Sequence, residues 1–373
     1  MPSALGEIKV LDFSRVLAGP LATMMLADLG AVVTKVEPPA GDDTRQWGPP
    51  HDAAGDATYF QAVNRNKQSL VLDLTDAADL AQARELAGEA DVLVENFRPG
   101  VTERFGLDYE SLRTMNPGLI YCSITGFGAG EGAALPGYDL LVQALGGLMS
   151  ITGPRDGGPQ KVGVALVDVL AGLFSTVGIL AALEYRGRSG EGQRVEVDLL
   201  SSLLAGLVNQ ASAYTVAGVV PERMGNEHPS VAPYESLRCA DDELVVAVGN
   251  DRQFGALCEV LGAPELAQDP RFETNNARVA NRAAMRAALE ERLATRAAGE
   301  WAELLTPARV PAGVVNDIGA AFELARRLGL DPVVSIERED GTTVELARNP
   351  IRLSATPPSY RSAPPRFTSR SGS

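Results

Sequence analysis

Cysteine and histidine are scarce in this chain of 373 residues, which contains three cysteines and two histidines. Cys122, Cys239 and Cys258 are scattered and odd in number, so a disulfide framework is disfavoured. A histidine-based zinc site or a Ser-His-Asp triad would have to be built from His51 and His228 alone. Both classes of site are therefore disfavoured.

Positive charge is also in short supply, because 33 lysines and arginines stand against 48 acidic residues and give a net charge of −15. Nucleic acid is an unfavourable partner for such a chain, since binding it requires a basic surface. An anionic small ligand remains compatible with this charge, provided that local basic residues receive it.

Residues 1–10 contain neither a basic segment nor a long apolar one, so we expect no signal peptide there. One apolar run, residues 162–183, is long enough to span a bilayer. Its interior Asp168, three glycines, serine and threonine, and the lack of flanking charge clusters, predict a buried core helix instead. We therefore expect a cytoplasmic protein with no membrane partner.

Neither a dinucleotide-binding fingerprint nor a phosphate-binding P-loop is present. The turn after the first predicted strand, residues 14–20, reads SRVLAGP instead of a glycine-rich motif, which disfavours a nicotinamide or flavin enzyme. The backbone amides of Val16 to Ala18 precede a predicted helix, however. They could receive a phosphate or a thioester oxygen.

Alternating strand-like and helix-like segments fill the first part of the chain and predict a parallel α/β sheet. Strands are expected at residues 8–13, 31–36, 69–72, 92–95, 119–123 and 194–197. Helices are expected at residues 20–29, 78–88, 110–115 and 199–216.

The predicted domains are a large Rossmann-like domain at 1–216, a linker at 217–233 and a smaller α+β domain at 234–309. The segment 310–363 is expected to return to the large domain, followed by a tail at 364–373. In the small domain we expect a strand at 244–248 and helices at 251–261, 281–294 and 298–305. The last part should contain a strand near 310–315, a helix at 320–328 and a hairpin across 339–341.

Basic residues near the predicted C-terminal ends of the strands could contact an anionic ligand, because an open α/β sheet binds its ligand at that edge. They are Arg15, Lys35, Arg45, Arg65, Lys67, Arg98 and Arg104. For each of them alone, a surface charge is the simpler interpretation.

Asp168 is the one carboxylate in the apolar run, and an isolated ionised carboxylate is costly to bury. If it opens its helix, the amides there would keep it ionised and could steady an oxyanion. It could instead be a helix cap or a core residue bonded to backbone, and taken alone that interpretation is favoured.

Taken together, the segments of this chain resemble the class III coenzyme A transferases, the family of formyl-CoA transferase, carnitine CoA-transferase and α-methylacyl-CoA racemase. The matching segments run in family order and cover nearly the whole chain: LDFSRVLAGPLATMMLADLGAVVTKVE, GDDTRQWG, NRNKQSLVLDL, DVLVENFRPGVTERFGLDYESL, NPGLIYCSITGFG, PGYDLLVQALGGLMSITG, KVGVALVDVLAGL, ALEYRGRSGEGQRVEVDLL, GNEHPSVAPYESL and DDELVVAVGNDRQF.

The resemblance implies an interlocked-ring homodimer and a transfer of CoA from an acyl-CoA donor to a carboxylic acid, with no permanently bound cofactor and no metal. Asp168 stands at the position of the family's nucleophile. It would form an aspartyl-acyl anhydride and then an aspartyl-CoA thioester. Succinyl-CoA with a small dicarboxylate is the substrate pair expected from the family.

The resemblance also implies the residues that bind coenzyme A. Val16 and Ala18 should contact it through backbone, Asn96 and Phe97 should lie beside the nucleotide, and Arg104 should meet a phosphate. Further candidates are Lys35, Arg45 and Arg98. Some relatives carry a basic residue where Pro38 stands, so contacts from that turn are in question.

Two other functions stay open. A 2-methylacyl-CoA racemase or epimerase needs a histidine paired with the aspartate, but Tyr138 occupies that position, which favours transfer. A non-catalytic CoA-binding homologue is the other alternative. Tyr138 could line the acyl pocket, and Glu227 and His228 are expected in a loop of the small domain that helps to close the site. Relatives carry an acidic helical tail where this chain ends in PRFTSRSGS.

Overall fold

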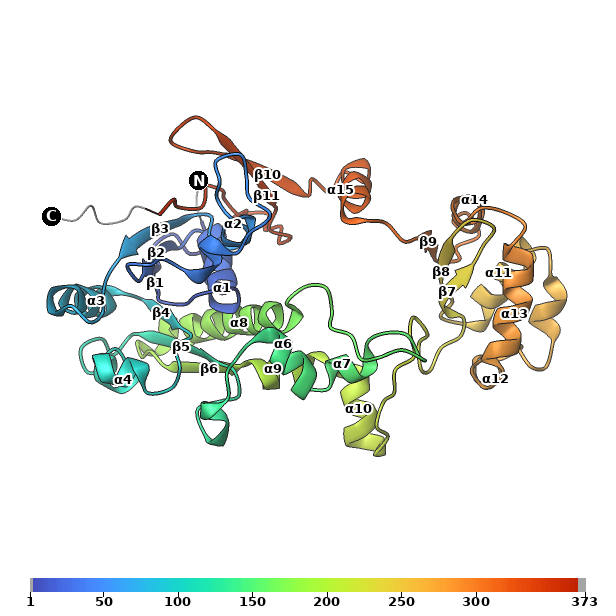
Figure 1. Cartoon of the computed structure of the whole chain (residues 1–373), viewed down its shortest axis with the longest axis horizontal. Coiled ribbons are helices and arrows are strands. Elements are labelled where there is room, and N and C mark those ends of the chain that lie inside the picture. Colours follow the sequence, from blue (N-terminus) through green and yellow to red (C-terminus); the bar gives the residue numbers. More distant parts are fainter. Residues whose placement is uncertain (1–2, 368–373) are drawn as a thin grey trace. The chain divides into compact units, whose positions relative to one another are not determined.

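The computed structural model describes residues 3–367 and divides them into two compact units (Figure 1). The first unit comprises residues 3–148, 161–220 and 331–367, and the second comprises residues 149–160 and 221–330. The division falls within the short helix α7 (Leu148–Ile151).

A six-stranded parallel sheet with the order β3-β2-β1-β4-β5-β6 forms the centre of the first unit. The strands are β1 (Lys9–Asp12), β2 (Val32–Glu37), β3 (Lys67–Val71), β4 (Val92–Glu95), β5 (Ile120–Thr125) and β6 (Arg194–Asp198). All six were predicted, and the parallel α/β fold is confirmed. The strand order reverses direction between β1 and β4, where open sheets of this kind bind their ligands.

Helices cover both faces of this sheet. The helices of this unit are α1 (Ala18–Asp28), α2 (Thr58–Ala62), α3 (Ala77–Glu89), α4 (Val101–Phe105), α5 (Tyr109–Arg113), α6 (Asp139–Leu145), α8 (Leu166–Ser189), α9 (Leu199–Gly206) and α10 (Val208–Ala217). The predicted helix at 199–216 is two helices, because Val208 adopts a left-handed φ of 42° and interrupts the run.

The alternation of side chains along the strands assigns helices to the two faces. Leu11, Leu93 and Tyr121 are in register on neighbouring strands, and they form one buried cluster with Ala83 and Ala87 of α3. The opposite face packs against α8, which also lies against α1. The nucleophile candidate Asp168 is therefore carried by a helix on the face opposite α3.

Helix α8 is buried along only one side. Among the described residues it is the one helix long and apolar enough to cross a membrane, with 39% of its most apolar window buried, which alone is weak evidence for a span. It contacts α1, α9, β5 and β6, in keeping with the predicted core helix. Its other side leaves Leu173, Phe174 and Val177 40%, 43% and 65% exposed, however.

A three-stranded antiparallel sheet and helices make up the second unit. Its elements are β7 (Tyr234–Arg238), β8 (Glu243–Ala247), β9 (Ala312–Val314), α11 (Asp251–Val260), α12 (Asn275–Ala280), α13 (Arg282–Leu293), α14 (Ala298–Leu305) and α15 (Ile318–Arg327). Strand β7 was not predicted. Its pairing with β8 across residues 239–242 produces it, and the YESLR sequence carries little strand signal of its own.

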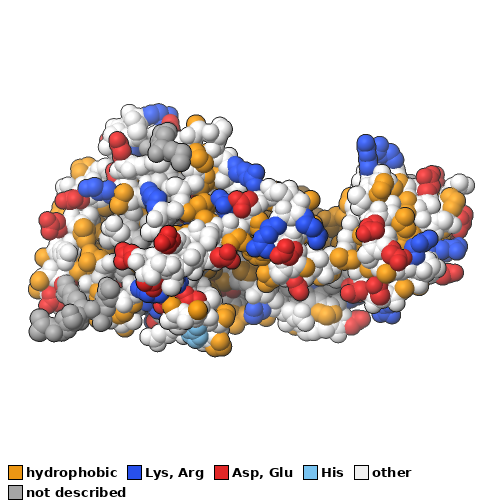
Figure 2. All heavy atoms as spheres, turned by 90° about the horizontal axis from the view of Figure 1, so that it is seen from above, with side chains coloured by type: hydrophobic (Ala, Val, Ile, Leu, Met, Phe, Trp, Pro, Cys, Tyr) orange, Lys and Arg blue, Asp and Glu red, His pale blue; other side chains and the backbone are white. Residues whose placement is uncertain are grey.

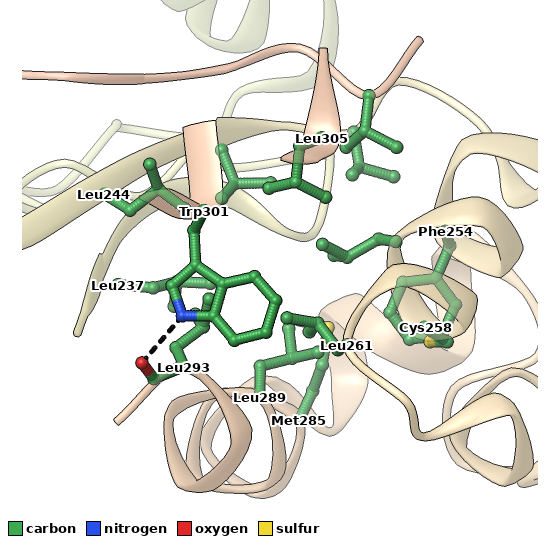
Figure 3. Packing of buried hydrophobic residues seen from close by; sticks show 14 of the residues in the cluster. Leu237, Leu244, Phe254, Cys258, Leu261, Met285, Leu289, Leu293, Trp301 and Leu305 are labelled. Atoms are coloured by element: carbon green, nitrogen blue, oxygen red, sulfur yellow. Dashed lines mark hydrogen bonds between the residues drawn. The ribbon is translucent and has the colours of Figure 1, made fainter. Parts of the chain in front are cut away.

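The core of the second unit is a buried apolar cluster between this sheet and its helices (Figure 3). The indole Nε1 of Trp301 donates a hydrogen bond of 2.9 Å to the Leu293 carbonyl oxygen, so the one polar atom of this large side chain is satisfied inside the core. Phe254, Cys258 and Leu289 pack in the same cluster.

The chain returns to the first unit later than the sequence indicated. The expected return at 310 is displaced to 331, because β9 pairs with β8 and keeps residues up to 330 with the second unit. Residues 149–160 were assigned to the large domain and belong to the second unit. The predicted hairpin across 339–341 is present as β10 (Val333–Glu337) and β11 (Thr343–Ala347).

The predicted tail at 364–373 lies partly outside the described residues, which end at 367. Within its described part, Arg366 pairs with Asp340 at 2.6 Å and with Asp56 at 3.4 Å, so this part is attached to the first unit.

On the face drawn in Figure 2, basic and acidic side chains are interspersed, with hydrophobic side chains scattered between them.

Candidate active site

A cavity of about 180 Å³ lies at the C-terminal edge of the parallel sheet, where the strand order reverses. The loops after β1, β4 and β5 contribute to its wall, as do the start of α6 and the first turn of α8. The residues that line it include Arg15, Val16, Leu17, Ala18, Asp43, Asn96, Phe97, Arg98, Thr125, Gly126, Gly137, Tyr138, Asp139 and Asp168. The structure thus gathers at one place most of the residues predicted to form the site.

Asp168 lies in the first turn of α8 and lines the cavity while remaining half-buried. Burial, and to a smaller extent the nearby charge of Asp139, together raise the pKa of its carboxyl from 3.8 to about 7. A carboxyl group with such a pKa is poorly solvated and only partly ionised near neutral pH. That environment suits a nucleophile or a general base better than a structural cap.

The carboxylate of Asp139 makes the hydrogen bond to the start of α8 that the sequence suggested for Asp168. Its Oδ1 accepts a hydrogen bond of 2.8 Å from the Val167 amide, and its Oδ2 accepts one of 2.7 Å from Gln143 Nε2. Gln143 is fully buried, and its Oε1 accepts a bond of 2.9 Å from the Val162 amide. The expectation that the helix amides keep Asp168 ionised is therefore wrong, because the Val167 amide already serves Asp139.

Two glycines allow the loop before α6 to reach the cavity. A Cβ atom on Gly126 would lie 2.4 Å from the Cα of Gly137, and a Cβ on Gly137 would lie 2.7 Å from the Cα of Gly126. The loop after β5 and the loop before α6 therefore cross at backbone contact, which only glycine permits. This crossing sets Tyr138 at the cavity wall, with its side chain 61% exposed.

The loop after β1 presents backbone amides to the cavity. Val16 adopts a φ of 70°, which is rare for a β-branched residue. Among the residues that the structure describes, no hydrogen-bond acceptor is found for the amides of Val16, Leu17 and Ala18. A loop with free amides at the start of a helix is suited to an anion or a polarised carbonyl oxygen.

Two arginines place positive charge at the cavity. Arg98 is exposed, and Arg15 makes an ion pair of 3.4 Å with Asp43 in which both side chains are well exposed. A second cavity of about 210 Å³ shares Arg15 and Phe97 with the first and extends past Pro38, Pro39 and residues 72–75. The two cavities together offer an elongated ligand one path along the sheet edge.

Three of the predicted phosphate contacts lie elsewhere. Lys35 is fully buried and paired with Asp42 at 2.9 Å. Arg45 is paired with Glu37 at 2.6 Å, and its guanidinium carbon lies 3.6 Å from the centre of the Phe60 ring. We therefore correct the assignment of Lys35 and Arg45, because both side chains already pair with buried acids, Asp42 and Glu37.

Arg104 is the third. It is exposed on α4 with its guanidinium over the Phe105 ring at 4.5 Å, and it does not line either cavity. The resemblance assigned it to a phosphate, whereas among residues 3–367 the basic side chains at the cavity wall are those of Arg15 and Arg98.

Glu227 and His228 belong to the second unit, where both have structural partners. Glu227 pairs with Arg155 at 2.5 Å and lies 3.7 Å from Arg282. Nδ1 of His228 accepts a bond of 3.1 Å from the Ser230 amide, and its ring stacks near Tyr234. These contacts account for both side chains within the second unit, and their predicted role in closing the site stays a prediction.

Sequence reasoning missed two residues near Asp168. Asp139 stands next to Tyr138 in the PGYD segment and was not singled out, although its pairing with a helix start is a frequent use of aspartate. Tyr59 lies within electrostatic reach, since burial and the charges of Asp168 and Asp139 raise its pKa. Tyr59 comes to lie beside α8 only through tertiary packing, so no local sequence pattern predicts its position.

No metal site accompanies these groups in the described part of the chain: residues 3–367 hold no cluster of three or more His, Cys, Asp and Glu side chains suited to a metal ion.

A family model described as CoA-transferase family III matches residues 5–370 of the sequence. A succinate–glutarate CoA-transferase of Agrobacterium fabrum is 45% identical over 97% of this chain and 92% of its own length. A succinyl-CoA:glutarate CoA-transferase of Mus musculus is 40% identical over 96% of this chain and 82% of its own length.

Solved structures agree with these sequence matches. The crystal structure of a CAIB/BAIF family protein from Brucella suis superimposes with a TM-score of 0.88 at 44% identity, covering 99% of this chain and 97% of that one. A protein of Mycobacterium tuberculosis superimposes with a TM-score of 0.87 at 33% identity, covering 98% and 97% of the two chains.

Proposed function

This chain belongs to CoA-transferase family III and is a CoA-transferase, and from that premise we propose that Asp168 carries the transferred group covalently. The reaction moves coenzyme A from an acyl-CoA to a carboxylic acid. One observation carries the proposal: the Asp168 carboxylate lies at the wall of the sheet-edge cavity. Burial and the nearby Asp139 carboxylate raise its pKa.

The first half of the reaction transfers CoA to the enzyme. An Asp168 carboxylate oxygen attacks the thioester carbonyl carbon, the carbon–sulfur bond breaks, and CoA leaves as a thiolate from an aspartyl-acyl anhydride. The thiolate then attacks the Asp168 carbonyl carbon of the anhydride. This step releases the donor's carboxylate and leaves an aspartyl-CoA thioester.

The second half repeats these steps in reverse with the acceptor. Its carboxylate attacks the aspartyl-CoA carbonyl carbon, and CoA leaves again as a thiolate. The thiolate attacks the acceptor's carbonyl carbon in the new anhydride, which yields the acceptor's CoA thioester and frees the Asp168 carboxylate. No proton, oxidant or metal enters the balance, and the energy of the thioester is retained.

The two cavities support a binding mode for coenzyme A. The loop amides of Val16 and Ala18 would receive the pantetheine chain, while the second cavity beside Phe97 would receive the nucleotide. Arg15 and Arg98 are the cations at these walls that could meet phosphate groups. Tyr138 would border the acyl group, and CoA itself is the substrate.

The relatives point to the class of acid. Three of them are named for succinate or succinyl-CoA with glutarate, and others for succinyl-CoA with mesaconate or D-citramalate. We therefore propose that succinyl-CoA is the donor and a small dicarboxylate the acceptor.

We also propose a homodimer, which the resemblance describes as interlocked, located in the cytoplasm. The exposed apolar side of α8 supports a partner surface, because Phe174 and Val177 would be unfavourably hydrated in a free monomer. The three free cysteines, all buried, are compatible with a reducing compartment.

A trapping experiment tests the proposal. The protein is incubated with succinyl-CoA, treated with hydroxylamine or borohydride, digested, and examined by mass spectrometry for a modified Asp168 peptide. Glu184→Gln is the matched control variant, since Glu184 is an exposed acid on the same helix paired only with Arg188. We expect modification at Asp168 in the parent and in Glu184→Gln, and none in Asp168→Ala.

Three results would contradict the proposal. Full CoA exchange by Asp168→Ala would exclude the covalent route. Deuterium uptake at the α-carbon of a 2-methylacyl-CoA without CoA exchange would favour the isomerase alternative, and binding of CoA with neither reaction would indicate a non-catalytic homologue.

A further inference from the structure

Two buried lysines that do not line the cavity, Lys35 and Lys67, hold the segment that links β1 to α1. Lys35 Nζ donates a bond of 2.8 Å to the Ser14 carbonyl oxygen, and Lys67 Nζ donates one of 2.9 Å to the Pro20 carbonyl oxygen. Both lysines are buried, and Asp42 and Asp12 balance their charges at 2.9 and 3.0 Å. The start of the loop and the first turn of α1 are thus each held by a charge-assisted hydrogen bond.

Asn96 holds the middle of the same loop. Its Oδ1 accepts a bond of 2.9 Å from the Arg15 amide, and its Nδ2 donates one of 2.8 Å to the Arg15 carbonyl oxygen. A trans peptide unit points its C=O and N–H in opposite directions. By fixing the Arg15 carbonyl, Asn96 therefore also fixes the direction of the Val16 amide, which belongs to the same peptide unit.

The conformation that results is one the loop would not keep unaided. Val16 has a φ of 70°, and a left-handed conformation is unfavourable for a β-branched residue unless its surroundings impose it. On the other side, the loop meets the helix that carries Asp168. A Cβ on Gly172 would lie 2.7 Å from the Ala18 carbonyl oxygen, so the loop and α8 are in backbone contact one turn beyond Asp168.

From this arrangement we propose that Asn96, Lys35 and Lys67 are positioning residues, which hold the amides of Val16 to Ala18 in a strained, ligand-ready conformation. The inference rests on the proposed function, because it takes the loop to be a contact of coenzyme A. It reassigns Asn96, whose side chain serves the Arg15 backbone, and Lys35, which acts on the ligand only through the loop.

Affinity for coenzyme A is the direct measure of this role. Isothermal titration of free CoA is carried out on the parent, on Asn96→Ala and on the double variant Lys35→Met/Asp42→Asn, which removes the buried pair without leaving an unpaired charge. Asn116→Ala is the matched control, since Asn116 also bonds backbone carbonyls, those of Ala90 and Ala87, in the same unit but away from the cavity.

We expect both positioning variants to weaken the Kd for CoA about tenfold or more, and Asn116→Ala to keep it within about twofold. Hydrogen–deuterium exchange of the free proteins adds a second readout: amides of residues 14–20 should exchange faster in Asn96→Ala than in the parent. This second measurement remains decisive if the double variant does not fold.

Unchanged CoA affinity in the folded double variant would overturn the inference, because the loop would then keep its binding conformation without the Lys35 contact to Ser14. Unchanged exchange of residues 14–20 in Asn96→Ala would overturn it as well. A parent protein that binds no CoA would instead contradict the proposed function, so the two failures are distinguishable.

Discussion

Asp139 accepts a hydrogen bond of 2.8 Å from the Val167 amide, so its carboxylate lies at the N-terminal turn of α8, the helix that carries Asp168. The helix end therefore compensates the charge of Asp139 and not that of Asp168. Asp168 keeps a raised pKa because it is poorly hydrated and faces a second carboxylate.

Covalent transfer by Asp168 should depend on pH through its ionisation. Only the carboxylate is nucleophilic, and its pKa is raised to about 7, so kcat/KM for the acyl-CoA should rise with pH through that value. Between pH 8 and pH 6 we expect a loss of about tenfold, measured by initial rates in buffers of constant ionic strength. A rate that is flat from pH 5 to 8 would contradict the raised pKa.

Removing the charge of Asp139 should lower the pKa of Asp168. In Asp139→Asn, the midpoint of the kcat/KM profile should move to lower pH, because one of the two causes of the shift is gone. Asp43→Asn is the control, since Asp43 lines the same cavity but is not a cause of that shift. The idea fails if Asp43→Asn moves the midpoint as far as Asp139→Asn does.

Asp168 should lower the stability of the folded protein at neutral pH. Its pKa is higher in the folded chain than its ordinary value of 3.8, so the folded state holds the proton more tightly, and its contribution to stability falls as pH rises from about 4 to 7. Asp168→Asn lacks this titration. The gain in thermal midpoint of Asp168→Asn over the parent should therefore be larger at pH 8 than at pH 5, and equal gains at both would refute this.

The glycine crossing beside Tyr138 should tolerate no side chain. Gly126→Ala would bring a Cβ to 2.4 Å from the Gly137 backbone and push the two loops apart. We expect at least a tenfold loss of kcat/KM together with a lower melting temperature. Gly130→Ala is the control, because no atom lies within 4 Å of its added Cβ; it should retain the parent's rate.

Arg278 should be the most sensitive ionic group of the second unit. It is fully buried, bonds the Ala232 and Phe272 carbonyl oxygens at 2.6 and 2.8 Å, and pairs with Asp251 at 2.7 Å. Arg278→Met should lower the free energy of unfolding by about 2–6 kcal/mol, since two buried carbonyl oxygens lose their donor at about 1–3 kcal/mol each. Arg292→Met, at an exposed pair with Glu265, should change it by less than about 1 kcal/mol in a urea titration.

The sequence determined the strands of the parallel sheet and the position of the nucleophile candidate. Strands such as β4 are short apolar runs bounded by turn residues, and that local pattern survives in any tertiary context. The order of family-like segments located Asp168 in the same way. By contrast, β7 and the late return of the chain at 331 depend on pairing with β8, which no local pattern encodes.

The fate of the charged side chains was decided only by the tertiary structure. Lys35 and Arg98 both stand near strand ends in the sequence. Lys35 is buried in an ion pair with Asp42, however, whereas Arg98 is exposed at the cavity. Asp139 and Asp168 are 29 positions apart, and only packing shows which one the helix amides stabilise. A residue's type is local information, whereas its solvation and its partners arise from chain segments that meet only on folding.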